Sequence, residues 1–122
     1  MTLRIIRAAE GETVNRTGAP IFEGTVHGRV LVDAKTSKDV SAALVHFSAG
    51  ARTRFHRHTS DQLLIVLNGI GRVGDREHDH VIATGDSVLI SAGTEHWHGA
   101  GDSGSPMTHI SITRPDSEST VL

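Results

Sequence analysis

The sequence contains no cysteine among its 122 residues. This absence excludes disulfide bonds, thiolate metal ligands and cysteine nucleophiles, so any metal ion must be held by other side chains. Proteins without disulfides are typical of reducing compartments. We therefore expect the protein in the cytoplasm.

Aromatic residues are scarce, since the chain has three phenylalanines, one tryptophan and no tyrosine. The hydrophobic core must therefore be built mainly from valine, isoleucine, leucine and alanine. A chain of 122 residues is long enough for one such core but not for two. The sequence predicts a single domain over residues 1–122.

Long apolar runs and an excess of one charge are also missing. The start of the chain, MTLRIIRAAE, has no apolar stretch long enough for a signal peptide or a membrane span. The formal net charge is -2 and no basic cluster is present, which argues against a nucleic acid partner. We expect a soluble protein that acts on a small molecule and binds neither membrane nor nucleic acid.

Short β-type segments separated by glycine and polar turns fill the chain, and no segment has a convincing helical pattern. The main predicted strands are residues 3–7, 21–26, 29–33, 40–47, 52–58, 62–68, 71–74, 78–83, 87–90, 95–98 and 107–114. Strands at this frequency indicate an all-β sandwich or barrel. The tail, residues 115–122, is expected to be flexible.

Two histidine pairs of the form HxH suggest a metal site. His56 and His58 follow a glycine turn, and His96 and His98 follow another. On a strand, alternate side chains share one face, which places the imidazoles of such a pair about 6 to 7 Å apart along the strand. Neutral imidazole is the commonest protein ligand for zinc and other first-row divalent metals. The first pair is therefore a candidate metal clamp, and the alternative is a solvated polar strand.

The two stretches together resemble the paired motifs of the cupin superfamily. The positions that match at the family spacing are Gly50, His56, His58, Gly69, Gly85, Gly93 and His96. Three positions depart from the motifs: Gln62 stands in place of a glutamate, Ser91 in place of a proline and Ala100 in place of an asparagine. The resemblance covers roughly residues 20–114.

This resemblance implies the cupin jelly-roll barrel and a divalent metal ion. It assigns the metal ligands to His56, His58, Gln62 and His96. Read without the family, Gln62 is a solvated residue at the start of a strand, and His96 is a loop histidine. Family members commonly cover their strand edges by pairing between subunits, so we expect a homodimer or a higher even oligomer.

A closer resemblance is to the small bacterial monocupins that include manganese-dependent hydroxynitrile lyases. It is carried by the runs GARTRFHRH, IVLNGIG, EHWHGA and PMTHISI. In that group three histidines and one glutamine hold the metal, which implies manganese here, with iron, zinc or nickel as alternatives. The pocket residues of the group correspond to Ala43, Val45 and Thr53, and His109 takes the acid/base position.

The face-sharing of strand residues adds two candidates for substrate binding. Thr113 has the same parity as His109 on the strand 107–114, and His98 has the same parity as His96. The sequence leaves open whether His98 is a ligand, a neighbour of the ligands or a pocket wall. It also leaves open whether His109 is a catalytic group or a buried structural histidine.

The remaining histidines are expected to be structural or exposed. His78 and His80 form a third HxH in the charged run GDREHDHV, which is typical of an exposed hairpin tip. His27 and His46 have no partner at ligand spacing.

The glutamine at position 62 affects the expected chemistry. Three neutral histidines and a neutral amide leave the charge of a divalent ion uncompensated, which makes it a stronger Lewis acid. The set also departs from the two-histidine, one-carboxylate triad of non-haem iron oxygenases. We expect a hydroxynitrile lyase-like enzyme that acts on a small hydroxylated or carbonyl substrate. The alternatives are an Fe(II)-dependent dioxygenase and a metal-dependent sugar isomerase or sugar-binding cupin without robust activity.

Overall fold

The computed structural model describes residues 3–122, and within that range it contains twelve strands and no helix. The strands are β1 (Val14–Asn15), β2 (Phe22–Glu23), β3 (Val26–Val32), β4 (Ser41–Phe47), β5 (Arg52–Thr53), β6 (His56–His58), β7 (Gln62–Gly74), β8 (Asp79–Ala83), β9 (Ser87–Ile90), β10 (Trp97–Gly99), β11 (Met107–Thr113) and β12 (Ser119–Val121). The part of the chain described therefore has no helix long and apolar enough to cross a membrane.

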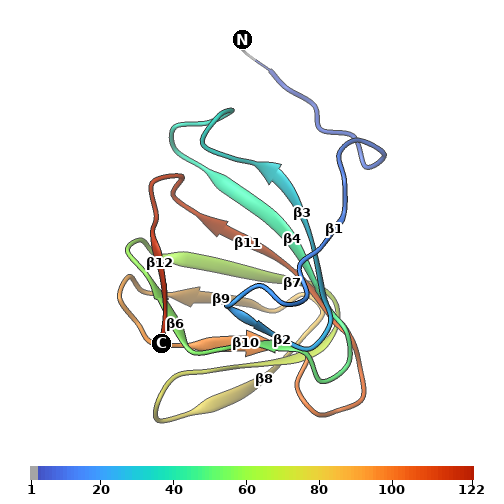
Figure 1. Ribbon diagram of the computed structural model, residues 1–122, viewed down its shortest axis with the longest axis vertical. Coiled ribbons are helices and arrows are strands. Elements are labelled where there is room, and N and C mark those ends of the chain that lie inside the picture. Colours follow the sequence, from blue (N-terminus) through green and yellow to red (C-terminus); the bar gives the residue numbers. More distant parts are fainter. Residues whose placement is uncertain (1–2) are drawn as a thin grey trace.

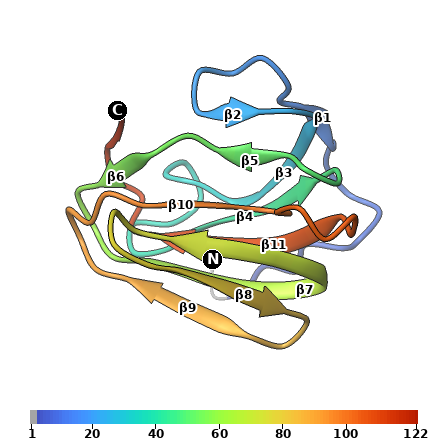
Figure 2. The ribbon, with the colours of Figure 1, turned by 90° about the horizontal axis from the view of Figure 1, so that it is seen from below.

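Ten of the strands form one antiparallel sheet in the order β1-β3-β4-β11-β7-β10-β5-β2, with β8 and β9 also paired to β7. The sheet curls, so that β3, β4 and β11 form one wall and β8, β10 and β2 lie across from it (Figure 1, Figure 2). Strand β7 belongs to both walls, because its first half pairs with β9 and β11 and its second half pairs with β8 and β10. This arrangement confirms the prediction of an all-β jelly-roll barrel.

Two glycines allow β7 to pass from one wall to the other. Gly69 lies at the bend with φ of 89°, and a Cβ atom there would collide with the carbonyl group of Pro106. A Cβ atom on Gly71 would collide with the carbonyl oxygen of Gly99 on β10. The absence of a side chain at both positions lets the strands approach closely. At Gly69 the positive φ is a second reason for glycine, because other residues rarely adopt it.

The core lies between the two walls and is mainly aliphatic, in agreement with the composition. Its buried residues are Val26, Phe47, Ala51, Leu64, Val66, Val73, Ile82, Ile90, Ala100 and Met107. Phe47 is the aromatic member, and the ring of Phe22 stands edge-on to it at a centroid distance of 6.0 Å. The inward-facing positions that this core does not fill carry the polar residues described below.

The two ends of the chain differ from the expectations. Residues 3–7, expected as a strand, lie outside any strand and are exposed, because no neighbouring strand of this chain pairs with them. The tail, expected to be flexible, instead contains β12, which pairs with β6 in a separate two-stranded sheet. The backbone groups of β6 provide the hydrogen-bonding partners that order this part of the tail.

Candidate metal centre

Three histidines from two parts of the chain meet at one end of the barrel. His56 and His58 project from β6, and their ring centroids are 4.9 Å apart. His96 lies directly opposite His56, because the backbone N–H of each residue donates to the carbonyl oxygen of the other at 2.9 Å. One nitrogen from each ring lies within 4.8 Å of the other two, a spacing that could hold a metal ion.

In all three imidazoles Nδ1 lies within hydrogen-bond distance of an oxygen atom. Nδ1 of His56 donates to the carbonyl oxygen of Arg54, and Nδ1 of His96 donates to that of Thr94, both at 2.8 Å. Nδ1 of His58 lies 2.7 Å from the hydroxyl oxygen of Ser119. Because a carbonyl oxygen only accepts, His56 and His96 carry their proton on Nδ1, which leaves the Nε2 lone pair free. This is the tautomer that a metal ligand requires.

Burial keeps these rings neutral. Removal from water, together with the neighbouring rings of His96 and His58, lowers the pKa of His56 to about 4. Burial also lowers the pKa values of His58 and His96 from their ordinary value. At neutral pH the three rings therefore offer lone pairs rather than positive charges.

Gln62, at the start of β7, is buried next to the three histidines. Its amide nitrogen donates to the hydroxyl group of Ser111 at 2.8 Å, which turns its amide oxygen towards His96. That oxygen is 3.0 Å from Nε2 of His96. With the proton of His96 on Nδ1, two acceptor atoms face each other, and burial disfavours the doubly protonated ring that would relieve this contact. A cation between them satisfies both lone pairs, so the donor set fits a metal ion.

A second histidine pair lies deeper in the barrel. His98 and His109 are buried, and Nε2 of His109 is 2.9 Å from Nδ1 of His98. The ring of His98 also lies 5.4 Å from that of His56, so it contacts both His109 and the three-histidine cluster. Burial lowers the pKa of His98 well below its ordinary value and that of His109 to about 4. Nε2 of His98 is buried and has no hydrogen-bond partner within residues 3–122.

Comparisons with known proteins agree with this architecture. The profile of the Cupin_2 family, described as a cupin domain, matches residues 43–113. The chain belongs to the cupin family. An enzyme named (R)-mandelonitrile lyase, from Granulicella tundricola, is 38% identical to this cupin over 109 residues, which make up 88% of this chain and 82% of that protein.

Two solved structures superpose on this one. A cupin-like protein from Thermotoga maritima is 31% identical and superposes with a TM-score of 0.82, covering 91% of this chain and 86% of that one. The polyketide cyclase RemF from Streptomyces resistomycificus superposes with a TM-score of 0.84 at 13% identity, covering 98% of this chain and 85% of that one. The second likeness shows the fold alone.

The other residues predicted to bind substrate lie on two strands of one wall and on β5. Ala43 and Val45 on β4 line a cavity of about 400 Å³ that also contacts Phe22. Thr53 is buried, and its hydroxyl oxygen accepts the backbone N–H of His98 at 3.0 Å, so it positions that strand. Thr113 is half-buried at the end of β11, paired with Ser41 on β4.

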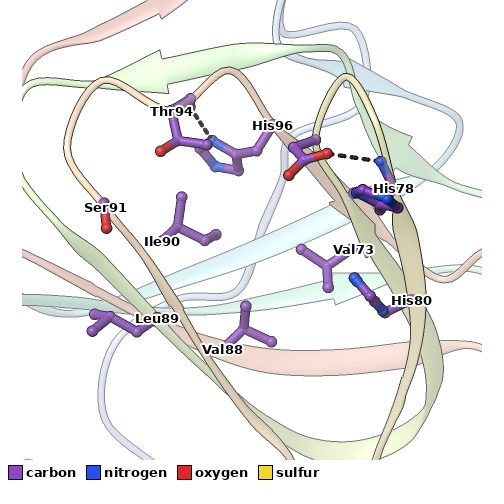
Figure 3. Close-up of a pocket in the computed structure, with 11 residues that line it drawn as sticks. Val73, His78, His80, Val88, Leu89, Ile90, Ser91, Thr94 and His96 are labelled. Atoms are coloured by element: carbon purple, nitrogen blue, oxygen red, sulfur yellow. Dashed lines mark hydrogen bonds between the residues drawn. The ribbon is translucent and has the colours of Figure 1, made fainter.

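His78 and His80 lie apart from the three-histidine cluster. Both are exposed. His78 lies in the turn between β7 and β8, where Asp75 accepts its backbone N–H, and His80 lies on β8. They line a cavity of about 230 Å³ whose far side is formed by Ile90, Thr94 and His96, as Figure 3 shows. This cavity shares only His96 with the cluster.

Sequence reasoning missed two residues that hold candidate metal ligands in place. Ser111 binds the amide nitrogen of Gln62, and Ser119 binds Nδ1 of His58. Serines on strands carry no pattern of their own, and Ser119 belongs to a tail expected to be flexible. Only the strand parity that Ser111 shares with His109 could have indicated that it faces the same interior.

Proposed function

We propose that this cupin is a metal-dependent lyase that splits a small hydroxynitrile into an aldehyde and hydrogen cyanide. The observation that supports a metal centre is the contact between the amide oxygen of Gln62 and Nε2 of His96, two acceptors 3.0 Å apart. The substrate class rests on the 38% identity to a protein named (R)-mandelonitrile lyase. We propose manganese as the ion, in line with the resemblance to manganese-dependent monocupins.

The ligands in this proposal are Nε2 of His56, His58 and His96 together with Oε1 of Gln62. A divalent ion held there supplies Lewis-acid polarisation of a hydroxyl or nitrile group. The chain contributes four neutral donors, so none of the ion's charge is cancelled by a ligand. The carbonyl oxygens that accept from Nδ1 leave the Nε2 lone pairs of His56 and His96 free, and one nitrogen of each of the three rings lies within 4.8 Å of the other two.

The proton is moved by the pair His98 and His109. When Nδ1–H of His98 donates to Nε2 of His109, the buried Nε2 of His98 is a free base, in a ring whose centroid is 5.4 Å from that of His56. In the cleavage direction it takes the proton of the substrate hydroxyl group, the O–H electron pair forms the carbonyl bond, and the C–C bond to the nitrile breaks. The electron pair of that bond leaves with cyanide, which then takes the proton from His98. His109, the acid/base candidate of the sequence, acts through its hydrogen bond to His98.

The test combines metal analysis with an activity assay. Protein purified without oxygen is loaded with manganese, iron, zinc or nickel, and cleavage of mandelonitrile is followed by the absorbance of benzaldehyde. We expect turnover with manganese, loss of turnover with a chelator, and a His98→Ala variant that keeps its metal but loses most activity.

Two results would point to another function. Metal-loaded protein that cleaves neither aromatic nor aliphatic hydroxynitriles would overturn the lyase proposal. Iron-loaded protein with substrate-dependent oxygen uptake would favour the dioxygenase, and isomerisation of a sugar would favour the sugar isomerase.

A further inference from the structure

The C-terminal strand β12 lies against the strand that carries two of the candidate metal ligands. Ser119 is in register with His58, and Val121 is in register with His56. The two strands form a sheet of their own, separate from the ten-stranded sheet, and the C-terminus lies beside β6 in both views (Figure 1, Figure 2). The end of the chain is therefore part of the wall behind these histidines.

The three candidate histidine ligands are not held in the same way. His56 and His96 are each held by a backbone carbonyl oxygen two residues earlier in the chain, those of Arg54 and Thr94. His58 is held by a side chain, the hydroxyl group of Ser119, from 61 residues away in sequence. Its Nε2 is buried and has no hydrogen-bond partner in the part of the chain that the structure describes. Ser119 is therefore the contact that fixes the orientation of this ring.

We propose that Ser119 is a positioning residue for the metal centre and that β12 completes this centre. The proposal rests on the metal site of the proposed function. By accepting Nδ1–H of His58, the hydroxyl oxygen keeps the proton away from Nε2 and holds the ring in the orientation that a ligand needs. Removing such a partner of a ligating histidine typically lowers metal affinity by about 10-fold to 100-fold.

The tail is held mainly by hydrogen bonds rather than by buried apolar surface. The backbone N–H of Thr59 donates to the carbonyl oxygen of Glu118, and that of Glu118 donates to the hydroxyl oxygen of Thr59, both at 2.9 Å. The backbone N–H of Leu122 donates to the carbonyl oxygen of Phe55 at 2.9 Å, while the side chains of Val121 and Leu122 remain exposed. A segment with little buried apolar area opens at low free-energy cost.

Docking of the tail and binding of the metal must therefore be linked. If the docked tail raises metal affinity by some factor, then bound metal stabilises the docked tail by the same factor, because the coupling is reciprocal. Slower amide hydrogen exchange at residues 118–122 on metal binding is the expected sign. This measurement does not depend on any enzymatic activity.

The experiment compares Ser119→Ala, Ser119→Thr and Thr120→Ala in the full-length protein. Thr120 lies on the same strand, in register with Arg57 rather than with a histidine, and serves as the matched control. Manganese affinity is measured from the free Mn(II) signal in electron paramagnetic resonance. We expect a loss of about 10-fold to 100-fold for Ser119→Ala, recovery of most of it in Ser119→Thr, and parent-like affinity for Thr120→Ala.

A second measurement needs no metal. Nitrogen-15 chemical shifts of metal-free protein report the tautomer of His58, and we expect Nδ1–H in the parent and a mixed population in Ser119→Ala. Parent-like affinity and an unchanged tautomer in a folded Ser119→Ala variant would overturn the role of Ser119. If the tautomer changes in Ser119→Ala but the parent binds no metal, the contact between Ser119 and His58 is established. The metal site, and with it the role of β12, is then overturned.

Discussion

The amide oxygen of Gln62 lies 3.0 Å from Nε2 of His96, a ring whose proton is already committed to the carbonyl oxygen of Thr94. The amide nitrogen of Gln62 is committed in turn to Ser111. Both groups are buried, so neither can turn to water to relieve the contact. The protein thus keeps two electron-rich atoms side by side, an arrangement that a cation stabilises.

Exchanging Gln62 for glutamate tests how much the neutral donor matters. Gln62→Glu keeps the reach of the side chain and adds a negative charge, so manganese affinity should rise. The same charge should weaken the Lewis acidity of the ion, so turnover per bound metal should fall. Gln62→Ala should lose less affinity than a histidine variant, because water can replace a carbonyl oxygen. Titration of both variants with manganese, followed by assays at full loading, measures the two effects separately.

This prediction fails if both variants, fully loaded, match the parent in affinity and turnover. In that case Gln62 would be a strand residue that happens to face the cluster, and the site would be one of three histidines.

The histidine pairs themselves can be tested against each other. Replacing His56, His58 or His96 with alanine should abolish stoichiometric metal binding, because each removes one of three converging nitrogen atoms. Replacing His78 or His80 with alanine should leave metal content unchanged, since both residues are exposed and neither belongs to the three-histidine cluster. Elemental analysis after dialysis measures the ratio of metal to protein. Metal loss in the His80 variant, with the His58 variant unaffected, would place the site on the other pair.

The sequence was sufficient to predict the features that depend on local spacing. Strand alternation and glycine turns led to an all-β barrel, and the HxH pattern led to histidines that the structure does bring together. The contacts of Ser119 with His58 and of Ser111 with Gln62 were not predictable in this way. They join residues 61 and 49 positions apart, and neither serine belongs to a motif. Such contacts depend on the register of paired strands, which a single sequence does not determine.

The exposed N-terminal segment leads to a prediction about assembly. Leu3 is 79% exposed and Ile5 is 57% exposed, although both are large apolar residues, and β1 pairs with β3 over only two residues. We propose a homodimer or a higher even oligomer in which this segment is covered by a second copy of the chain. The double variant Leu3→Glu, Ile5→Glu should sediment as a smaller species than the parent at micromolar concentration.

Leu89, which is 68% exposed on β9, provides the matched control. Leu89→Glu should leave the sedimentation of the parent unchanged. A monomeric parent would contradict the proposed assembly, whereas dissociation caused by Leu89→Glu alone would move the interface to β9.

The buried His109 should make the metal-free protein sensitive to acid. Its pKa is lowered by burial and by the neighbouring His46, to about 4 in the folded protein, against an ordinary value of 6.5. Between these two pH values the unfolded chain binds a proton at His109 that the folded protein does not. The contribution of the neutral His109 to the free energy of unfolding is therefore fully present above pH 6.5. It is lost as the pH falls towards 4. His98, whose pKa is also lowered by burial and by His109, adds to the same trend.

The measurement is urea unfolding of chelator-treated protein at pH 7 and pH 4.5, for the parent and for His109→Gln, which has no titrating group at this position. We expect the loss of stability between the two pH values to be smaller in the variant by about 2 kcal/mol, the contribution of one histidine with this shift. The variant should be less stable than the parent at pH 7, because the hydrogen bond to His98 is changed, so only the difference between the two pH values is informative. Equal losses in both proteins would show that His109 takes up its proton in the folded state as readily as in the unfolded chain, and that its burial does not keep it neutral.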